Sequence, residues 1–195
     1  MARKHEYERN EAIKKMIIDA ALAICLEDGY KEVTVRRIGD KIGYSTGVIY
    51  YHFRDKQDIM DSLDKRLDEE AYVAISKIIN ADSSIAENLS ALYDYTCDLA
   101  YNNAEVYKRI FVASRVEGNG NTRSMWLSMI KDCLVKAAER GEIASDDIDA
   151  TSKCVLAYIT GYNLLFFEIT RTCIETAKAD KENAISSILN GILAH

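Results

Sequence analysis

The sequence predicts an all-helical protein made of two parts. The chain of 195 residues contains no Pro and only 9 Gly, so few residues can end or kink a helix. Apolar residues make up 48% of the chain and recur at helical spacing, whereas no segment alternates apolar and polar residues as a half-buried strand does. This length allows one large or two small domains.

A first helix is predicted ahead of residue 29. Its apolar positions follow a helical period: Ile13, Ile17, Ala20, Ala21 and Ile24. Gly29 then supplies a residue that tolerates the left-handed backbone common at helix ends.

Two short helices joined by a turn are predicted within Thr34–Lys56. Thr34 can cap the first by accepting a hydrogen bond from a backbone N–H, and Gly43 stands where that helix must end. Ser45 can cap the second helix, and Asp55 can cap the helix that follows. Two helices joined by a short Gly-containing turn form the helix-turn-helix unit, which places its second helix in the DNA major groove. The segment therefore predicts a DNA-binding domain over residues 1–57.

This segment resembles the DNA-binding domain of TetR-family transcriptional regulators. The resemblance is carried by Gly29-Tyr30, Thr34-Val-Arg-Arg-Ile-Gly, Ile42-Gly43, Val48-Ile-Tyr-Tyr-His-Phe and Asp55-Lys56. It covers roughly the first third of the chain. At Gly39 such proteins often have Ala, and Gly costs about 1 kcal/mol of helix propensity, so a local weakness is expected there. The resemblance implies a C-terminal helical bundle that binds a small molecule and dimerises through its last two long helices.

The resemblance and the helix-turn-helix pattern together indicate which residues contact DNA. Arg36 matches an Arg that the family places against the groove, and residues 45–48 open the recognition helix, the end that meets base edges. Tyr and Lys further along resemble the family's phosphate contacts, although His52 could instead pack at the helix end. The predicted set is Thr34, Arg36, Ser45, Thr46, Gly47, Val48, Tyr50, Tyr51, His52 and Lys56.

Charge is divided unevenly between the two parts. The net charge is −6, but residues 1–57 hold 11 Lys and Arg against 9 Asp and Glu, a balance of +2. Residues 58–195 hold 14 against 22, a balance of −8. Phosphate neutralisation requires local cations and not a basic whole chain, so this distribution is compatible with DNA binding. Arg37 and Lys41 are expected to face solvent or phosphate.

Residues 58–195 are predicted to form a second helical domain. Helices are expected over about 56–80, 85–101, 106–111 and 122–140, then from a cap at Ser145 or Asp146 to about 173, and last over about 181–193. Asn102-Asn103 and Gly141 separate helices, and residues 117–121 form the clearest loop.

The last two long helices are predicted to form a homodimer interface. The final helix carries an apolar stripe, the helix around residues 154–167 is apolar nearly all round, and Gly161 would let another helix approach closely. Alternatively, both helices belong to the core of one chain. The predicted interface consists of Gly161, Leu165, Ile185, Ile188, Leu189 and Ile192.

An effector pocket is expected inside the second domain. Aromatic and sulfur side chains with a few hydroxyls suit an apolar or amphipathic ligand, although the same residues at helical spacing could be ordinary core. The candidates are Tyr93, Cys97, Phe111, Trp126, Met129 and Tyr158.

Several other classes of protein are disfavoured by the sequence. There is no Gly-rich phosphate loop and no nucleophile motif, so an enzyme is not predicted. The 3 His lie far apart in sequence, so neither a metal site nor a cofactor is expected. The 5 scattered Cys suit a reducing cytoplasm and read as buried apolar residues. The longest charge-free run, Cys154 to Phe167, is shorter than the ~20 residues of a membrane span, and no secretory signal is recognised.

These inferences predict a cytoplasmic, homodimeric transcriptional regulator. It is expected to bind double-stranded DNA at an inverted repeat and to act as a repressor that a small-molecule effector releases. The alternative is a helical DNA-binding interaction factor controlled by a partner protein or by no effector.

Overall fold

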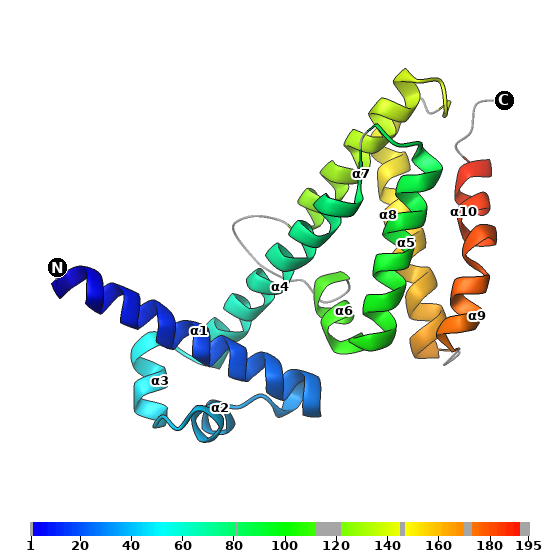
Figure 1. The fold of residues 1–195 in the computed structure, drawn as a ribbon. Helices are drawn as coiled ribbons and strands as arrows, with labels where there is room; N and C mark the ends of the chain where they lie inside the picture. The colour runs from blue at the N-terminus through cyan, green and yellow to red at the C-terminus, as the bar shows by residue number, and fades with distance from the viewer. Residues whose placement is uncertain (1, 81, 112–121, 145–146, 170–172, 192–195) are drawn as a thin grey trace. The chain divides into compact units, whose positions relative to one another are not determined.

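The computed structural model describes residues 2–80, 82–111, 122–144, 147–169 and 173–191. Within them the structure contains helices and no strand, which confirms the predicted fold class (Figure 1). The chain divides into two compact units, the first ending at Leu67 and the second beginning at Asp68. This division falls inside the helix α4 (Lys56–Ile78), whereas the boundary predicted at residue 57 lies near the start of that helix.

The first unit is a small helical domain. It contains α1 (Ala2–Asp28), the 3-10 turn η1 (Tyr30–Glu32), α2 (Val35–Ile42), α3 (Thr46–His52) and the beginning of α4. Each α-helix contributes at least one fully buried aliphatic side chain to its core: Ile17, Ile24, Ile38, Ile49, Ile59 and Leu63. Because these positions recur at helical spacing, the apolar pattern of the sequence and the core of the unit coincide.

The second unit is a helical bundle. After the remainder of α4 it contains α5 (Ile85–Asn102), α6 (Ala104–Phe111), α7 (Thr122–Glu139), α8 (Ile148–Leu164), a π-helical segment η2 (Leu165–Ile169), α9 (Ile174–Ala179) and α10 (Lys181–Asn190). In Figure 1, α5, α7 and α8 pack side by side, and α9 and α10 lie along α5.

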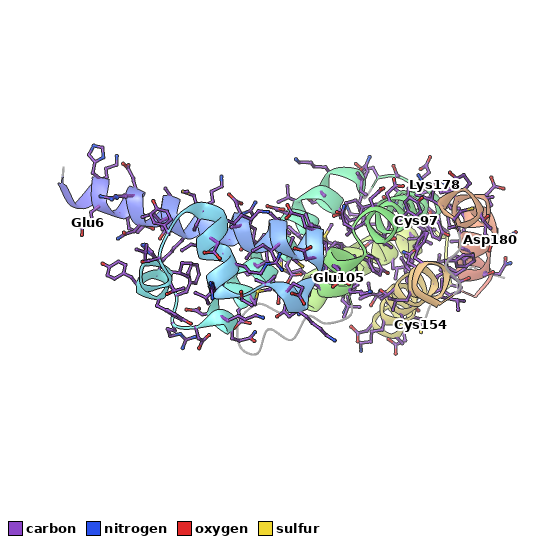
Figure 2. The ribbon with its side chains drawn as sticks, turned by 90° about the horizontal axis from the view of Figure 1, so that it is seen from below. Glu6, Cys97, Glu105, Cys154, Lys178 and Asp180 are labelled. Atoms are coloured by element: carbon purple, nitrogen blue, oxygen red, sulfur yellow. The ribbon has the colours of Figure 1, made fainter. Side chains whose placement is uncertain are left out.

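Polar contacts hold α9 and α10 against α5. The Tyr93 hydroxyl donates to the carbonyl oxygen of Ala177 at 2.8 Å. Lys181 pairs with Asp94 at 3.0 Å, and Lys178 pairs with Asp98 at 2.6 Å. Figure 2 shows Lys178 beside the part of α5 that carries Cys97.

The end of the chain differs from its predicted course. Ser145 and Asp146 lie outside the described residues, as does the predicted loop at 117–121, and the side chain that caps α8 is Asp147, which accepts from the backbone N–H of Ala150 at 2.9 Å. The helix predicted to reach about residue 173 ends at Leu164 and continues as η2. The short helix α9, which the sequence did not predict, then precedes α10.

Candidate functional site

The helix-turn-helix of the first unit has the caps that its sequence predicts. Thr34 Oγ1 accepts from the backbone N–H of Arg37 at 3.2 Å, and Ser45 Oγ accepts from that of Val48 at 3.4 Å. Between them, Gly43 adopts a left-handed φ of 72°, which ends α2. These short-range contacts fix the angle at which α3 leaves α2, and α3 is the predicted recognition helix.

Most of the predicted DNA contacts are exposed. Ile49 is fully buried and anchors α3, whereas Tyr50 and Tyr51 are 54% and 76% exposed. His52 is half-buried and packs edge to face against the Tyr51 ring, with centroids 5.1 Å apart. The remaining predicted residues are exposed, apart from two that are half-buried: Thr34, Arg36, Ser45, Thr46 and Gly47 are exposed, and Val48 and Lys56 are half-buried.

The cations of the unit differ in how strongly they are already paired. Arg37 contacts both Asp28 and Glu32, and Lys41 Nζ lies 2.7 Å from a carboxylate oxygen of Glu27. Arg36 is more loosely held, since its Nε is 4.0 Å from an Asp40 oxygen and its side chain is 87% exposed. Arg36 is therefore the more available of the two arginines for a phosphate or base.

Two of the predicted effector residues meet in an aromatic cluster of the second unit. The Phe111 ring centroid lies 5.1 Å from that of Trp126 and 4.9 Å from that of Tyr107. Trp126 is buried, and Met129 on the next turn of α7 is half-buried. We name Tyr107, Phe111 and Trp126 the aromatic cluster.

Two other predicted effector residues, Tyr93 and Cys97, belong to a different group. They pack with Ala177 and Ala184 and with the partly buried Tyr162. Burial raises the pKa of the Cys97 thiol to about 11, so this thiol is protonated and unreactive at neutral pH. These residues join α5 to α9 and α10 and read as core.

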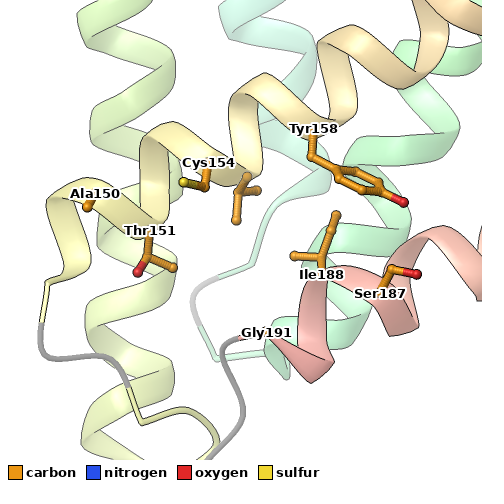
Figure 3. A pocket seen from close by; sticks show the side chains of 8 residues that line it. Ala150, Thr151, Cys154, Tyr158, Ser187, Ile188 and Gly191 are labelled. Carbon is orange, nitrogen blue, oxygen red and sulfur yellow. The ribbon is translucent and has the colours of Figure 1, made fainter.

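Tyr158 belongs to neither of these groups and lines a groove between α8 and α10. The groove has a volume of about 340 Å³, and Figure 3 shows Tyr158 and Cys154 on one side of it facing Ser187 and Ile188 on the other. We call it the α8/α10 groove; its lining residues are Ala150, Thr151, Cys154, Val155, Tyr158, Ser187, Ile188 and Gly191.

The predicted dimer residues fall into two classes of burial. Gly161, in the last turn of α8, and Leu165, the first residue of η2, are exposed. Ile185 and Ile188 are buried within the chain, and Leu189 is half-buried. Ile192 lies outside the described residues.

Comparison with known proteins identifies the first unit. Residues 17–63 match the family described as bacterial regulatory proteins, tetR family. The helix-turn-helix segment is therefore similar to the DNA-binding domains of that family. Over 65 residues the chain is 40% identical to the HTH-type transcriptional repressor Rv1474c of Mycobacterium tuberculosis, a match that covers 33% of this chain and only 34% of that protein.

Longer matches are weaker in sequence. The chain is 25% identical over 145 residues to the HTH-type transcriptional repressor KstR2 of M. tuberculosis, which covers 68% of this chain and 70% of that protein. The crystal structure of the regulator FadR from Bacillus subtilis in complex with stearoyl-CoA superposes with a TM-score of 0.72 at 20% identity, covering 91% of this chain and 98% of that one. At that identity the likeness concerns the fold alone, and it extends over the second unit.

Sequence reasoning missed two polar features of the second unit. The Asn163 carboxamide and the Trp126 indole N–H are buried, and none of their polar atoms has a hydrogen-bond partner among the described residues. Asn163 was visible as a polar residue interrupting the apolar run Cys154–Phe167, but its spacing alone did not show what it faces.

The described residues contain neither a metal-binding cluster nor a membrane-spanning helix. No group of three or more His, Cys, Asp or Glu side chains there could hold a metal ion. No helix in the same residues is both long enough and apolar enough to cross a membrane.

Proposed function

We propose that this protein is a homodimeric transcriptional repressor of the TetR family that binds an inverted repeat and leaves it when a small molecule binds the second unit. The observation that carries the DNA-binding part is the capped α2–α3 unit, with Ile49 buried beneath exposed Tyr50 and Tyr51. Chromosomal DNA as the target implies work in the cytoplasm.

The relatives support the repressor and effector parts of this proposal. Two TetR-family proteins that match this chain are named repressors, and the FadR structure holds stearoyl-CoA. A second structure, a regulator from Saccharomonospora viridis in complex with choline, superposes with a TM-score of 0.71 at 20% identity. Small-molecule binding is therefore consistent with this fold, although the two ligands differ in chemistry.

The helix α4 supplies a physical route for the response. Its 23 residues continue without a break from the first unit into the second. A ligand changes DNA affinity only if it binds the DNA-incompetent state more tightly, and couplings of about 1–3 kcal/mol are usual. A continuous helix can transmit such a preference, because it moves as one element and not as a flexible linker.

The DNA-binding claim is tested by selecting operator fragments from genomic DNA with the purified protein. The wild type should bind an inverted repeat with an affinity that falls as salt rises. Arg36→Ala and Tyr50→Ala should each weaken binding by about tenfold or more without lowering the melting temperature, because both side chains are exposed.

The matched control is Tyr101→Ala, which removes a comparably exposed tyrosine from α5 in the other unit. It should leave operator affinity unchanged. A wild type that enriches no fragment, or variants that bind as tightly as the wild type, would contradict the proposed role of α2 and α3 in DNA binding. A protein that binds DNA but responds to no small molecule would favour control by a partner protein.

A further inference from the structure

Two side chains in the second unit have buried polar atoms without partners among the described residues. Trp126 is 2% exposed and Asn163 is 1% exposed, and the unpaired atoms are the indole Nε1 and both Nδ2 and Oδ1 of the amide. Leaving a buried donor or acceptor unpaired costs about 1–3 kcal/mol, so folded proteins contain few such groups. Two such side chains on adjacent helices therefore require an explanation.

The aromatic cluster lies on α6 and α7, and Asn163 approaches it from α8. Trp126 is itself a member of the cluster. On α8, the carbonyl oxygen of Thr160 accepts from the Tyr107 hydroxyl at 3.1 Å, and Asn163 lies one turn further along the same face. Burial raises the pKa of that hydroxyl, and the nearby Asn163 carboxamide opposes the rise, so the carboxamide lies close to Tyr107 although no well-formed hydrogen bond joins the two. Trp126 thus contacts the cluster at Phe111, and Asn163 approaches it at Tyr107.

The chemistry of these neighbours indicates what they would accept. The indole N–H can only donate, whereas the carboxamide offers two donors and one acceptor. The side chains that the contacts place here, Tyr107, Phe111, Trp126 and Asn163, are all uncharged. Burying a carboxylate without a cation is far more costly than burying a neutral oxygen. A neutral carbonyl or hydroxyl oxygen on an apolar body fits both the donors and the ring surfaces.

We propose that Trp126 and Asn163 bind a neutral carbonyl or hydroxyl oxygen of an apolar effector, whose body packs against Phe111 and Tyr107. This rests on the proposed function and narrows its ligand class. Both polar groups are buried before the ligand arrives, so their surroundings must separate on binding. The ligand therefore selects a conformation that the free protein populates little, as an effector that changes DNA affinity must do.

The test uses sets of probes that differ only in one polar group. Each apolar body (a dodecyl chain, a decalin and a steroid nucleus) is tested as the hydrocarbon, ketone, alcohol and carboxylate. Binding to the full-length wild type is followed by thermal shift and by the emission of Trp126, which is the only Trp of the chain. For at least one body the ketone or alcohol should bind at least tenfold more tightly than both the hydrocarbon and the carboxylate.

Three variants test the residues. Trp126→Phe keeps a ring but removes the N–H, and Asn163→Leu replaces the amide by an apolar side chain of similar size. Each should weaken ketone or alcohol binding, measured by thermal shift, by at least tenfold, while hydrocarbon binding stays the same. Neither should lose stability through lost hydrogen bonds, because these atoms make none with the described residues. Asn102→Leu removes an exposed amide at the end of α5 and should change neither class of binding.

The outcomes separate this inference from the proposed function. Ligand affinity that is unchanged in both variants overturns the polar-oxygen site, even where that ligand still releases the operator from the wild type. Preference for the carboxylate, or no preference over the hydrocarbon for any body, also overturns it. Failure of the wild type to bind an operator instead overturns the proposed function.

Discussion

At Gly39, the space that a Cβ would need reverses the expectation that Ala would be the more stable residue in this helix. It is buried in α2, and a Cβ built on it would lie 2.6 Å from the carbonyl oxygen of Tyr44 and 3.5 Å from Cδ1 of Ile49. The first neighbour is backbone of the turn between the two short helices, which cannot rotate away as a side chain would. Gly39 lowers the helix propensity of α2, but only a residue without a Cβ lets the turn pack this closely against the helix.

Gly39→Ala should destabilise the first unit. Ala gains about 1 kcal/mol of helix propensity, but relieving the contact requires the turn to move, and such overpacking costs about 1–3 kcal/mol. Denaturant unfolding should show a lower midpoint, and operator affinity should fall because the same turn orients α3. Gly47→Ala is the control for the unfolding measurement, since its Cβ would meet only Ser45 Oγ at an ordinary 3.7 Å. A Gly39→Ala variant more stable than the wild type would show that the turn yields easily.

The elements of this fold divide into those that local chemistry defines and those that packing defines. The predicted caps at Thr34 and Ser45 and the predicted stops at Gly43 and Gly141 all appear in the structure. By contrast, α8 gives way to a π-helical segment without any Pro or Gly there to signal it. That change accompanies contacts from afar, such as Tyr162 donating to Asp180, which no local pattern reveals.

Glu142 makes a long-range contact that helps position the start of α5. Its carboxylate accepts from the backbone N–H of Ile85 at 2.7 Å and pairs with Arg140. The Arg140 hydrogen bond, aided by that of Ile85, holds the pKa of Glu142 below its usual range. A group with a lowered pKa in the folded state contributes stability above its unfolded pKa, and this contribution is lost as the pH falls through the folded value.

Glu142→Gln should therefore be less stable than the wild type at pH 7, by a small margin because the carboxylate is only partly shielded from solvent. The difference between the two proteins should shrink as the pH falls below about 4, since the unfolded Glu pKa is about 4.3. Urea unfolding at a series of pH values measures this. Glu139→Gln, at an exposed position near the end of α7, serves as the control. A difference that grows toward acid pH would argue against the assignment.

At the scale of the whole molecule, the face formed by α8 and α10 is the surface proposed for dimerisation. Tyr158, Gly161 and Leu165 are exposed there, and the α8/α10 groove runs beside them. An inverted repeat read by one fold requires a two-fold arrangement. We therefore propose that a second copy covers this face. Ile188, predicted as an interface residue, is largely buried in its own chain and so suits a mutational test poorly.

Gly161→Glu should produce monomers and abolish operator binding. Nothing lies within 4 Å of a Cβ at this position among the described residues, so the change should leave the fold of one chain intact while placing a charge in the interface. Light scattering at micromolar concentration gives the mass. Ser128→Glu, exposed on α7, is the matched control and should remain dimeric.

Cysteine labelling supplies a second measurement of the same prediction. Cys154 lines the α8/α10 groove, whereas Cys173 is exposed elsewhere, ahead of α9. In the wild type Cys154 should react more slowly than Cys173, and in Gly161→Glu the two rates should approach each other. A wild type that is monomeric and labels equally at both thiols would exclude this interface.

The predicted effector set shows where sequence reasoning stops. Helical spacing indicated that Phe111, Trp126 and Tyr158 each belong to an apolar face of their own helix. Spacing along one helix does not indicate which other helix that face meets. The structure brings Phe111 and Trp126 together but places Tyr158 on the α8/α10 groove, and it adds Asn163, whose polarity had no assigned role.

The ion pairs of the first unit have a consequence for how the chain responds to salt. Glu27, Asp28 and Glu32 already neutralise Arg37 and Lys41 from within the same chain. A Lys or Arg that neutralises a phosphate releases a cation condensed on the DNA, but a side chain held by a carboxylate of its own chain must first give up that pairing. The number of ions released on binding therefore falls short of the number of basic residues in the unit. Part of its positive charge orders the fold and contributes little to long-range attraction for nucleic acid.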